Sequence, residues 1–236
     1  MTSLTVTVFQ VIYSQDWHPP DHISFFSNLG LRQLDPTWLS VTDTRVENIK
    51  MFDEVTFKRY PPYRQRLWPD HGIQGSEGAK FHPNITTPKR SQIIQKGQNP
   101  LIDAYSAFFD NTEIKGSGDT GLRRLVKDST EVVVVGLAQD YCVAWTGLDS
   151  LGLGLPTTIL SDHTRPVDVT SGEEMMEKVK EAGGIVTTLR DYKDELQEWS
   201  KAKEIANFLI RNSAETSSLS SLILTVILAV TASLHN

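Results

Sequence analysis

The stretch VVVVGLAQDYCVAWTGLDSLG, residues 132–152, carries both the fold signal and the chemistry of this 236-residue chain. Its four valines predict a buried parallel strand, Gly136 ends that strand, and an amphipathic helix is expected at or just after Cys142. Open parallel sheets expose reactive groups at such junctions. The free N–H groups and the dipole at a helix start favour a thiolate, so we interpret Cys142 as a nucleophile. Core filler is the alternative, because free cysteines are usually buried and unreactive.

Composition narrows the class of protein. With 39% hydrophobic residues, the chain can bury a sizeable core. A formal net charge of −6 and the lack of a basic stripe argue against nucleic acid as a partner. Cys142 is the only cysteine, which excludes an internal disulfide and a cysteine metal cluster. The N-terminal segment has neither a positive region nor a small-residue cleavage pattern, so we expect a cytoplasmic protein.

Short β-branched runs alternate with helical segments along the chain, which predicts βαβ crossovers and a parallel sheet. The expected strands are Val6–Ser14, Gln92–Lys96, Glu131–Val135, Thr157–Leu160 and Ile185–Thr188. Helices are expected after Asp119, Cys142, Ser171 and Asp194. Ser171 and Glu174 match a capping box, which would start the third of these helices. Residues 28–66 lack clear periodicity and are expected to form a long excursion over the active face.

The C-terminal residues differ from the rest, so we divide the chain into a domain over residues 1–211 and a tail over residues 212–236. The tail has a polar spacer and then an apolar run, residues 222–234, that is short for a membrane span of about 20 residues. Small residues, a spacer and an apolar end resemble a lipid-anchor signal. Membrane association through residues 222–234 is therefore one interpretation, and a divergent chain end is the other.

Histidines and an aspartate gather in one part of the sequence. Asp16 and His18 follow the first expected strand, His22 comes four residues later, and His71 stands in the segment Trp68-Pro-Asp-His71. One carboxylate and two or three imidazoles make a mixed site that suits Zn²⁺, Fe²⁺ or Mn²⁺. An Asp-x-His turn also occurs for structural reasons alone. Of the histidines in this window, His22 and His82 are the least expected as ligands.

Lys96 closes an apolar strand and is followed by Gly97. A lysine at such a position is ordinarily a surface residue whose stem lies along apolar neighbours. Beside a cysteine at the end of a neighbouring strand, it could instead hold a thiolate or move protons. Both interpretations stay open on the residues alone.

Five segments together resemble the nicotinamidase branch of the isochorismatase-like cysteine hydrolases, and the region around KMFDEV and PPYRQR looks most like the animal-type enzymes. The segments are SQDWHPPDHISF, LWPDHGIQGSEGAKFH, KGQNPLIDAYSAFFDN, GLAQDYCVAWTGLDSLGLG and SDHTRPVD. They follow the family's order and spacing between about residues 6 and 190. The resemblance implies a three-layer α/β/α sandwich around a parallel sheet.

The resemblance also implies an activity: hydrolysis of nicotinamide to nicotinate and ammonia through a cysteine thioester, in NAD salvage. Cys142 matches the nucleophile and Lys96 the catalytic lysine. Ala138 and Cys142 match the backbone N–H groups of an oxyanion hole, beside a cis peptide at Leu137–Ala138.

Further positions follow from the same resemblance. Asp16, His18 and His71 match the ligands of one divalent transition metal ion (Zn, Fe or Mn), which in this family binds the pyridine nitrogen of nicotinamide. His22 matches a position that is a ligand in some members only. Trp68 and Tyr105 match residues that wall the ring pocket. A homo-oligomer is compatible with the family.

One departure concerns the start of the chain. The family begins with a central strand that carries the catalytic aspartate, the general base, and this sequence starts at the second strand. We therefore expect the first central strand to be missing and activity and stability to be reduced. The spare apolar segments Leu4–Val8 and Leu222–Val230 are not expected to fill the gap, because the tail must reach it from a distant terminus. The alternative function is a catalytically impaired splice or truncation product that keeps metal- and ligand-binding residues but no general base.

Overall fold

The computed structural model describes residues 8–35, 46–58, 63–112, 116–212 and 224–231. Its strands are β1 (Val8–Asp16), β2 (Glu54–Phe57), β3 (Tyr63–Arg66), β4 (Gln92–Lys96), β5 (Glu131–Leu137), β6 (Thr157–Arg165), β7 (Ile185–Thr187) and β8 (Leu224–Thr231). Its α-helices are α1 (Leu122–Val126), α2 (Ala144–Gly152), α3 (Val169–Glu181) and α4 (Leu189–Asn212). Short 3₁₀ turns cover Phe26–Leu31, Val46–Asn48 and Glu77–Ala79, and a π-helical turn covers Gln139–Val143.

Six strands form one sheet in the order β4-β1-β8-β5-β6-β7, and every pair of neighbours is parallel. The five strands expected from β-branched runs are all present, with ends that differ by at most five residues. Val132, Val133 and Val134 are buried, as expected for a strand covered on both faces. The parallel α/β architecture is therefore confirmed.

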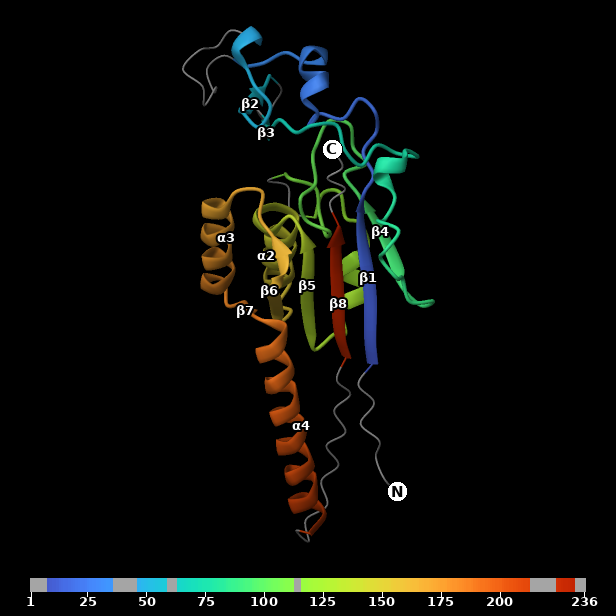
Figure 1. The fold of residues 1–236 in the computed structure, drawn as a ribbon, viewed down its shortest axis with the longest axis vertical. Helices are drawn as coiled ribbons and strands as arrows, with labels where there is room; N and C mark the ends of the chain where they lie inside the picture. Colours follow the sequence, from blue (N-terminus) through green and yellow to red (C-terminus); the bar gives the residue numbers. More distant parts are fainter. Residues whose placement is uncertain (1–7, 36–45, 59–62, 113–115, 213–223, 232–236) are drawn as a thin grey trace.

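Strand β8 lies in the middle of this sheet, between β1 and β5 (Figure 1). Its residues 224–231 pair with residues 8–15 of β1, and residues 225–230 pair with residues 131–136 of β5. Our expectation that the apolar tail would stay out of the sheet is wrong, and residue 211 is not a boundary that separates the tail from the domain. Without β8, the facing edges of β1 and β5 would leave two ladders of backbone groups unpaired. The entropic cost of closing the long loop that brings β8 there grows only logarithmically with loop length, so filling the gap is favoured.

Two helix starts differ from the expectation. The α3 helix is capped by Asp168, whose carboxylate accepts a hydrogen bond from the Ser171 backbone N–H at 2.8 Å, so Ser171 is not the cap. The α4 helix begins at Leu189, five residues before Asp194, because the Thr188 hydroxyl oxygen accepts from the Asp191 N–H at 3.2 Å. In both helices, the side chain that accepts a hydrogen bond from the first turn lies a few residues before the expected start of the helix.

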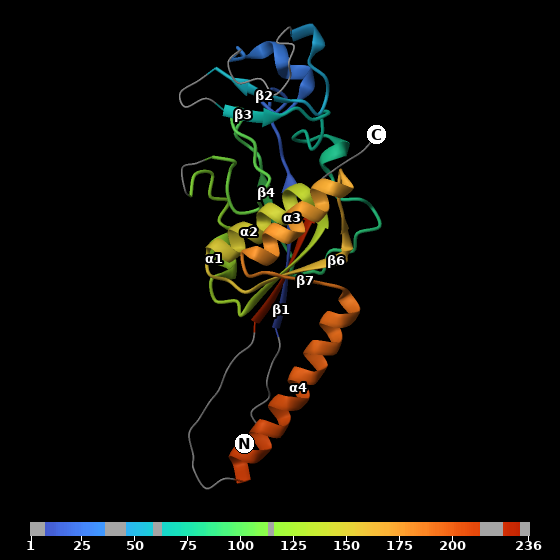
Figure 2. The same cartoon turned by 90° about the vertical axis from the view of Figure 1, so that its left-hand side faces the viewer.

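Helices α1, α2 and α3 lie along the sheet, while α4 extends away from its lower end (Figure 2). The Tyr192 hydroxyl near the start of α4 donates to the Glu131 carboxylate at 2.8 Å, which ties α4 to the first residue of β5. Among the described residues, no helix is both long enough and apolar enough to cross a membrane.

The excursion expected over residues 28–66 contains a second, antiparallel sheet of β2 and β3. It stands beyond the ends of β1, β8 and β5 to which the strand arrows point (Figure 1). Its inner side chains, among them Val55, Phe57 and Tyr63, belong to a separate small apolar core. The excursion is therefore a packed cover over the carboxyl ends of the parallel strands, where open α/β sheets bind ligands.

Candidate active site

The carboxyl ends of three parallel strands converge on one pocket. Asp16 is the last residue of β1, Lys96 is the last residue of β4, and Cys142 lies in the π-helical turn that follows β5. The lining residues are Asp16, His18, Trp68, His71, Lys96, Asp103, Ala104, Tyr105, Ala138, Tyr141, Cys142 and Val167. Every site residue proposed from the sequence except His22 lines this pocket.

Lys96 connects the thiol to a carboxylate. Its ammonium nitrogen lies 3.5 Å from the Cys142 Sγ and 2.6 Å from the Asp16 Oδ1, and it donates to the Ala104 carbonyl at 2.6 Å. All three ionisable side chains are buried. The interpretation of Lys96 as a surface residue is therefore wrong. The Asp16–Lys96 ion pair was not foreseen, since the sequence argument assigned Asp16 to a metal only.

Burial sets the charge state of the thiol. Desolvation raises the pKa of Cys142 to about 11, although the nearby Lys96 ammonium acts in the opposite direction. Our expectation of a thiolate favoured by the helix start is wrong for the resting state, because desolvation outweighs the local field. For Asp16, burial alone would raise the pKa, but Lys96 and the two histidines bring it down to about 2. The pocket therefore holds a neutral thiol beside a charged ion pair at pH 7.

The raised pKa predicts how Cys142 reacts with alkylating agents. Since only the thiolate is alkylated, the rate with iodoacetamide should rise about tenfold per pH unit through pH 9 and level off only near pH 11. Mass spectrometry can follow the alkylation of Cys142 without ambiguity, because the chain has one cysteine. Glutathione is the exposed-thiol control. A Cys142 rate that levels off at or below pH 9 would contradict the buried, neutral thiol.

The backbone turn around Cys142 is held from two sides. The Leu137–Ala138 peptide is cis, and the Ala138 carbonyl accepts from the Val143 N–H at 3.0 Å. The buried Asp140 carboxylate accepts from the N–H groups of Val167 and Asp168 at 2.9 and 3.1 Å. These bonds fix the turn against the loop that follows β6. Asp140 was missed in the sequence, where an aspartate two residues before a cysteine carries no distinct signal.

Three aromatic rings wall the pocket. Trp68 lies edge-on to Tyr141 and Tyr105, with ring centroids 4.6 and 6.4 Å apart, and the two tyrosines are 5.2 Å apart. The Arg66 guanidinium lies 6.0 Å from the Tyr141 ring centroid, at the distance of a cation–π contact. Such walls suit a flat aromatic ligand. Tyr141 was not among the predicted residues, although it stands directly before Cys142.

His18 and His71 are each oriented by a hydrogen bond to a backbone carbonyl. The Nδ1 atoms of His18 and His71 each lie 2.8 Å from a backbone carbonyl, of Gly97 and Pro69 respectively. A carbonyl only accepts, so each Nδ1 carries the proton and each Nε2 keeps its lone pair. The potential ligand atoms of Asp16, His18 and His71 all lie within 4.8 Å of one another. This donor set fits a divalent transition metal ion.

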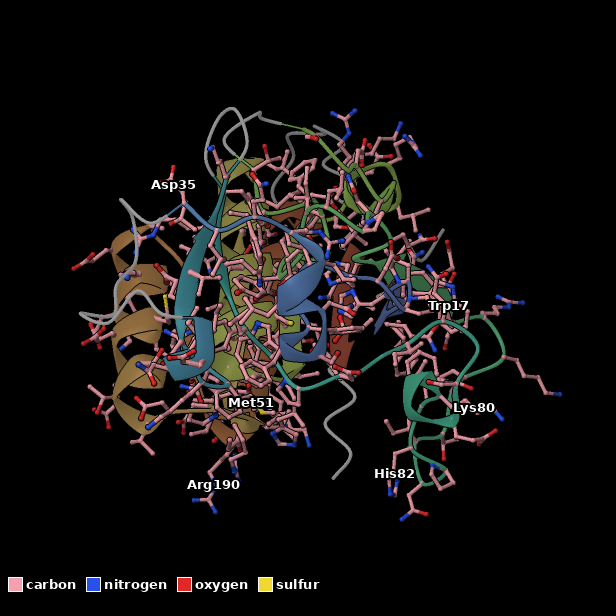
Figure 3. The ribbon with its side chains drawn as sticks, turned by 90° about the horizontal axis from the view of Figure 1, so that it is seen from above. Trp17, Asp35, Met51, Lys80, His82 and Arg190 are labelled. Atoms are coloured by element: carbon pink, nitrogen blue, oxygen red, sulfur yellow. The ribbon has the colours of Figure 1, made fainter. Side chains whose placement is uncertain are left out.

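The other two histidines of this part of the sequence, His22 and His82, differ in position: the His22 ring centroid lies 4.1 Å from that of His18, whereas His82 lies away from the group. His82 is exposed on a loop at the periphery, next to Lys80 (Figure 3). His22 is fully buried and forms a second group with His18 and Asp103, whose potential ligand atoms also lie within 4.8 Å of one another. Asp103 was missed in the sequence; its position seven residues after Lys96 gave no hint that it would meet His22.

A family model described as the isochorismatase domain matches residues 42–191. The chain belongs to the isochorismatase family. A nicotinamidase of Escherichia coli (strain K12) is 38% identical over 188 residues, which cover 78% of this chain and 77% of that protein. A nicotinamidase of Acinetobacter baylyi is 36% identical over 67% of this chain and 64% of that protein.

Solved structures of isochorismatase-family proteins share the fold. An Acinetobacter baumanii nicotinamidase pyrazinamidease superposes with a TM-score of 0.63 at 33% identity, over 78% of this chain and 79% of that one. A yeast nicotinamidase bound to the inhibitor nicotinaldehyde gives a TM-score of 0.62 at 25% identity, over 76% and 79% of the two chains. The expected three-layer α/β/α class is confirmed.

Proposed function

We propose that this chain is an amidase that hydrolyses nicotinamide to nicotinate and ammonia through a thioester on Cys142. The observation that carries the proposal is the Cys142 thiol, 3.5 Å from the Lys96 ammonium in a pocket walled by Trp68, Tyr105 and Tyr141. Each of the two curated relatives described above is a nicotinamidase, which points to the same substrate.

In the first half-reaction, the Cys142 sulfur attacks the carboxamide carbon and the thiol proton leaves the enzyme on ammonia. The Lys96 ammonium beside the sulfur stabilises the negative charge that develops there, and Asp16 keeps Lys96 protonated. Backbone N–H groups of the turn at Ala138 and Cys142 are the proposed donors to the carbonyl oxygen. In the second half-reaction, water cleaves the thioester, which releases nicotinate and restores the thiol.

We place one divalent transition metal ion, Zn²⁺, Fe²⁺ or Mn²⁺, at Asp16, His18 and His71, where the fixed Nε2 atoms and a carboxylate fit it. Bound there, the ion supplies a positive charge that attracts the pyridine nitrogen. The Trp68 and Tyr105 rings then hold the flat ligand with its carboxamide toward Cys142.

An ammonia-release assay on metal-supplemented protein tests the function, with benzamide as the matched substrate because it lacks the ring nitrogen. We expect release from nicotinamide and much slower release from benzamide. No ammonia from nicotinamide would contradict the proposal, and equal rates with both amides would contradict the role of the ring nitrogen.

Changing His71 to alanine should weaken nicotinamide binding at least about tenfold, because it removes an imidazole from the proposed metal site. The measurement is calorimetric titration of nicotinamide into protein that also carries Cys142→Ala, so that no turnover occurs. His82→Ala, on the exposed loop, is the matched control and should bind like its parent. Unchanged affinity in His71→Ala protein would refute this assignment.

A further inference from the structure

Phe52 has a backbone conformation that its residue type disfavours. It is the third residue of a turn closed by the Asp53 N–H, which donates to the Lys50 carbonyl at 3.1 Å, and its φ is 73°. Turns with a positive φ at the third position favour glycine, because a Cβ is strained there. Among the described residues, Phe52 is the only one other than glycine with a positive φ. Strain of this kind persists only where the surrounding structure fixes it, and it clusters at functional sites.

Burial does not explain a phenylalanine at this position. The side chain is 45% exposed, and it is not one of the residues of the small apolar core that contains Val55 and Phe57. A glycine would relieve the backbone strain and would remove only a half-buried ring. The reason for the phenylalanine therefore lies in the particular groups that it contacts.

Phe52 contacts three consecutive residues, the last of which belongs to the aromatic wall of the pocket. Its N–H donates to the Leu67 carbonyl at 2.7 Å, and its own carbonyl accepts from the Arg66 Nη1 at 2.8 Å. Its ring lies edge-on to the Trp68 ring, with the centroids 5.7 Å apart and the planes at 82°. An edge-to-face pair stabilises both rings in that orientation. Phe52 thus holds the backbone before Trp68 as well as the Trp68 ring.

Arg66 extends this contact to a second ring of the wall. The side chain that donates to the Phe52 carbonyl also places its guanidinium 6.0 Å from the Tyr141 ring centroid. A cation at this distance is attracted to the face of the ring. The strained turn therefore orients the cation that lies over Tyr141, and Tyr141 in turn packs against Trp68.

We propose that Phe52 is a positioning residue, which holds Trp68 through its ring and Tyr141 through Arg66 so that the pocket accepts a flat ligand. Phe52 does not line the pocket, so it acts only through these side chains. The identity of the ligand, nicotinamide, rests on the proposed function. The position of the wall can be measured without any ligand, because Trp68 and Tyr141 line the same pocket as Cys142.

The first test is the rate at which iodoacetamide alkylates Cys142 at one fixed pH in metal-supplemented protein. Phe52→Ala and Phe52→Gly both remove the ring, but only glycine also relieves the strain at this φ. Each should speed alkylation about 3- to 10-fold, the factor that corresponds to the loss of one edge-to-face ring pair. Phe52→Tyr, which keeps the ring, should react like the wild type. Met51→Ala, at the exposed neighbouring residue outside the pocket lining, is the matched control and should also react like the wild type.

The second test separates the role of the ring from a merely structural role. Phe52→Gly should melt about 2–4 °C above Phe52→Ala, because it adopts a positive φ without strain. Calorimetric titration of nicotinamide into chains that also carry Cys142→Ala should nevertheless show the same loss of affinity, about 3- to 10-fold, for both variants.

Four results would overturn the proposal: wild-type alkylation rates in Phe52→Ala and Phe52→Gly, equally fast alkylation in Met51→Ala, a defect that glycine repairs in step with its melting temperature, or unchanged affinity where the parent chain binds nicotinamide. If Phe52→Ala does not fold, Phe52→Gly and Phe52→Tyr decide. A parent chain that binds no nicotinamide would contradict the proposed function, and the alkylation rates would still decide the role of Phe52.

Discussion

Replacing Cys142 with alanine should lower ammonia release from nicotinamide by at least about 10⁴-fold while the protein stays folded. The loss should be this large because the thiol is the only cysteine sulfur in the chain and forms the bond from which both half-reactions proceed. The measurement is turnover at saturating nicotinamide, alongside a thermal melt. A variant that kept more than a small fraction of wild-type turnover would rule out the thioester route.

Val143→Ala is the matched control for that experiment. Val143 is the next residue in the same turn, is fully buried and does not line the pocket. Its truncation should lower stability by about 1–3 kcal/mol through lost burial and a cavity. Turnover should stay near wild type at a temperature where the variant is folded. The comparison separates the chemistry of the sulfur from the packing of the turn.

Deleting residues 224–236 should abolish cooperative unfolding, because it removes β8 from the centre of the sheet. The strand pairs with β1 and β5 along nearly its whole length. Each buried backbone group left without a partner costs about 1–3 kcal/mol, and a domain's whole stability is only about 5–15 kcal/mol. A thermal melt followed by circular dichroism measures the effect.

The control for that deletion removes residues 232–236 and keeps every residue of β8. It should melt as sharply as the full chain. If the longer deletion also melted sharply and kept ammonia release, the central place of β8 would be wrong. The pair of deletions thus tests the strand and not the mere presence of a C-terminal segment.

Local sequence signals predicted most of the sheet and most of the residues that line the pocket. Runs such as Val132–Val135 specify strands through their own residues, and the parallel topology brings Asp16, Lys96 and Cys142 to one edge. Partners that depend on three-dimensional proximity were not foreseen. The Asp16–Lys96 ion pair and the meeting of Asp103 with His22 depend on which segments the fold brings together. The raised pKa of Cys142 follows from its burial.

The place of β8 was beyond local signals for another reason. The sequence of residues 222–234 predicts an apolar strand, but it contains no signal for which two strands this strand will pair with. The distance along the chain argues against this position for β8, but pairing the backbone groups of β1 and β5 outweighs it. The start of α3 could not be predicted from local signals either, because Asp168 and Ser171 are both suitable N-cap residues in the sequence.

The central position of β8 also determines when the molecule can finish folding. Its ladder with β1 joins residues more than 200 positions apart, for example Val8 with Leu224, and contacts so remote in sequence form slowly. Until β8 arrives, β1 and β5 each present an open, apolar edge to solvent and to other chains. The slow step of refolding should therefore be the docking of β8, and aggregation during refolding should fall when a peptide with the β8 sequence is added in excess.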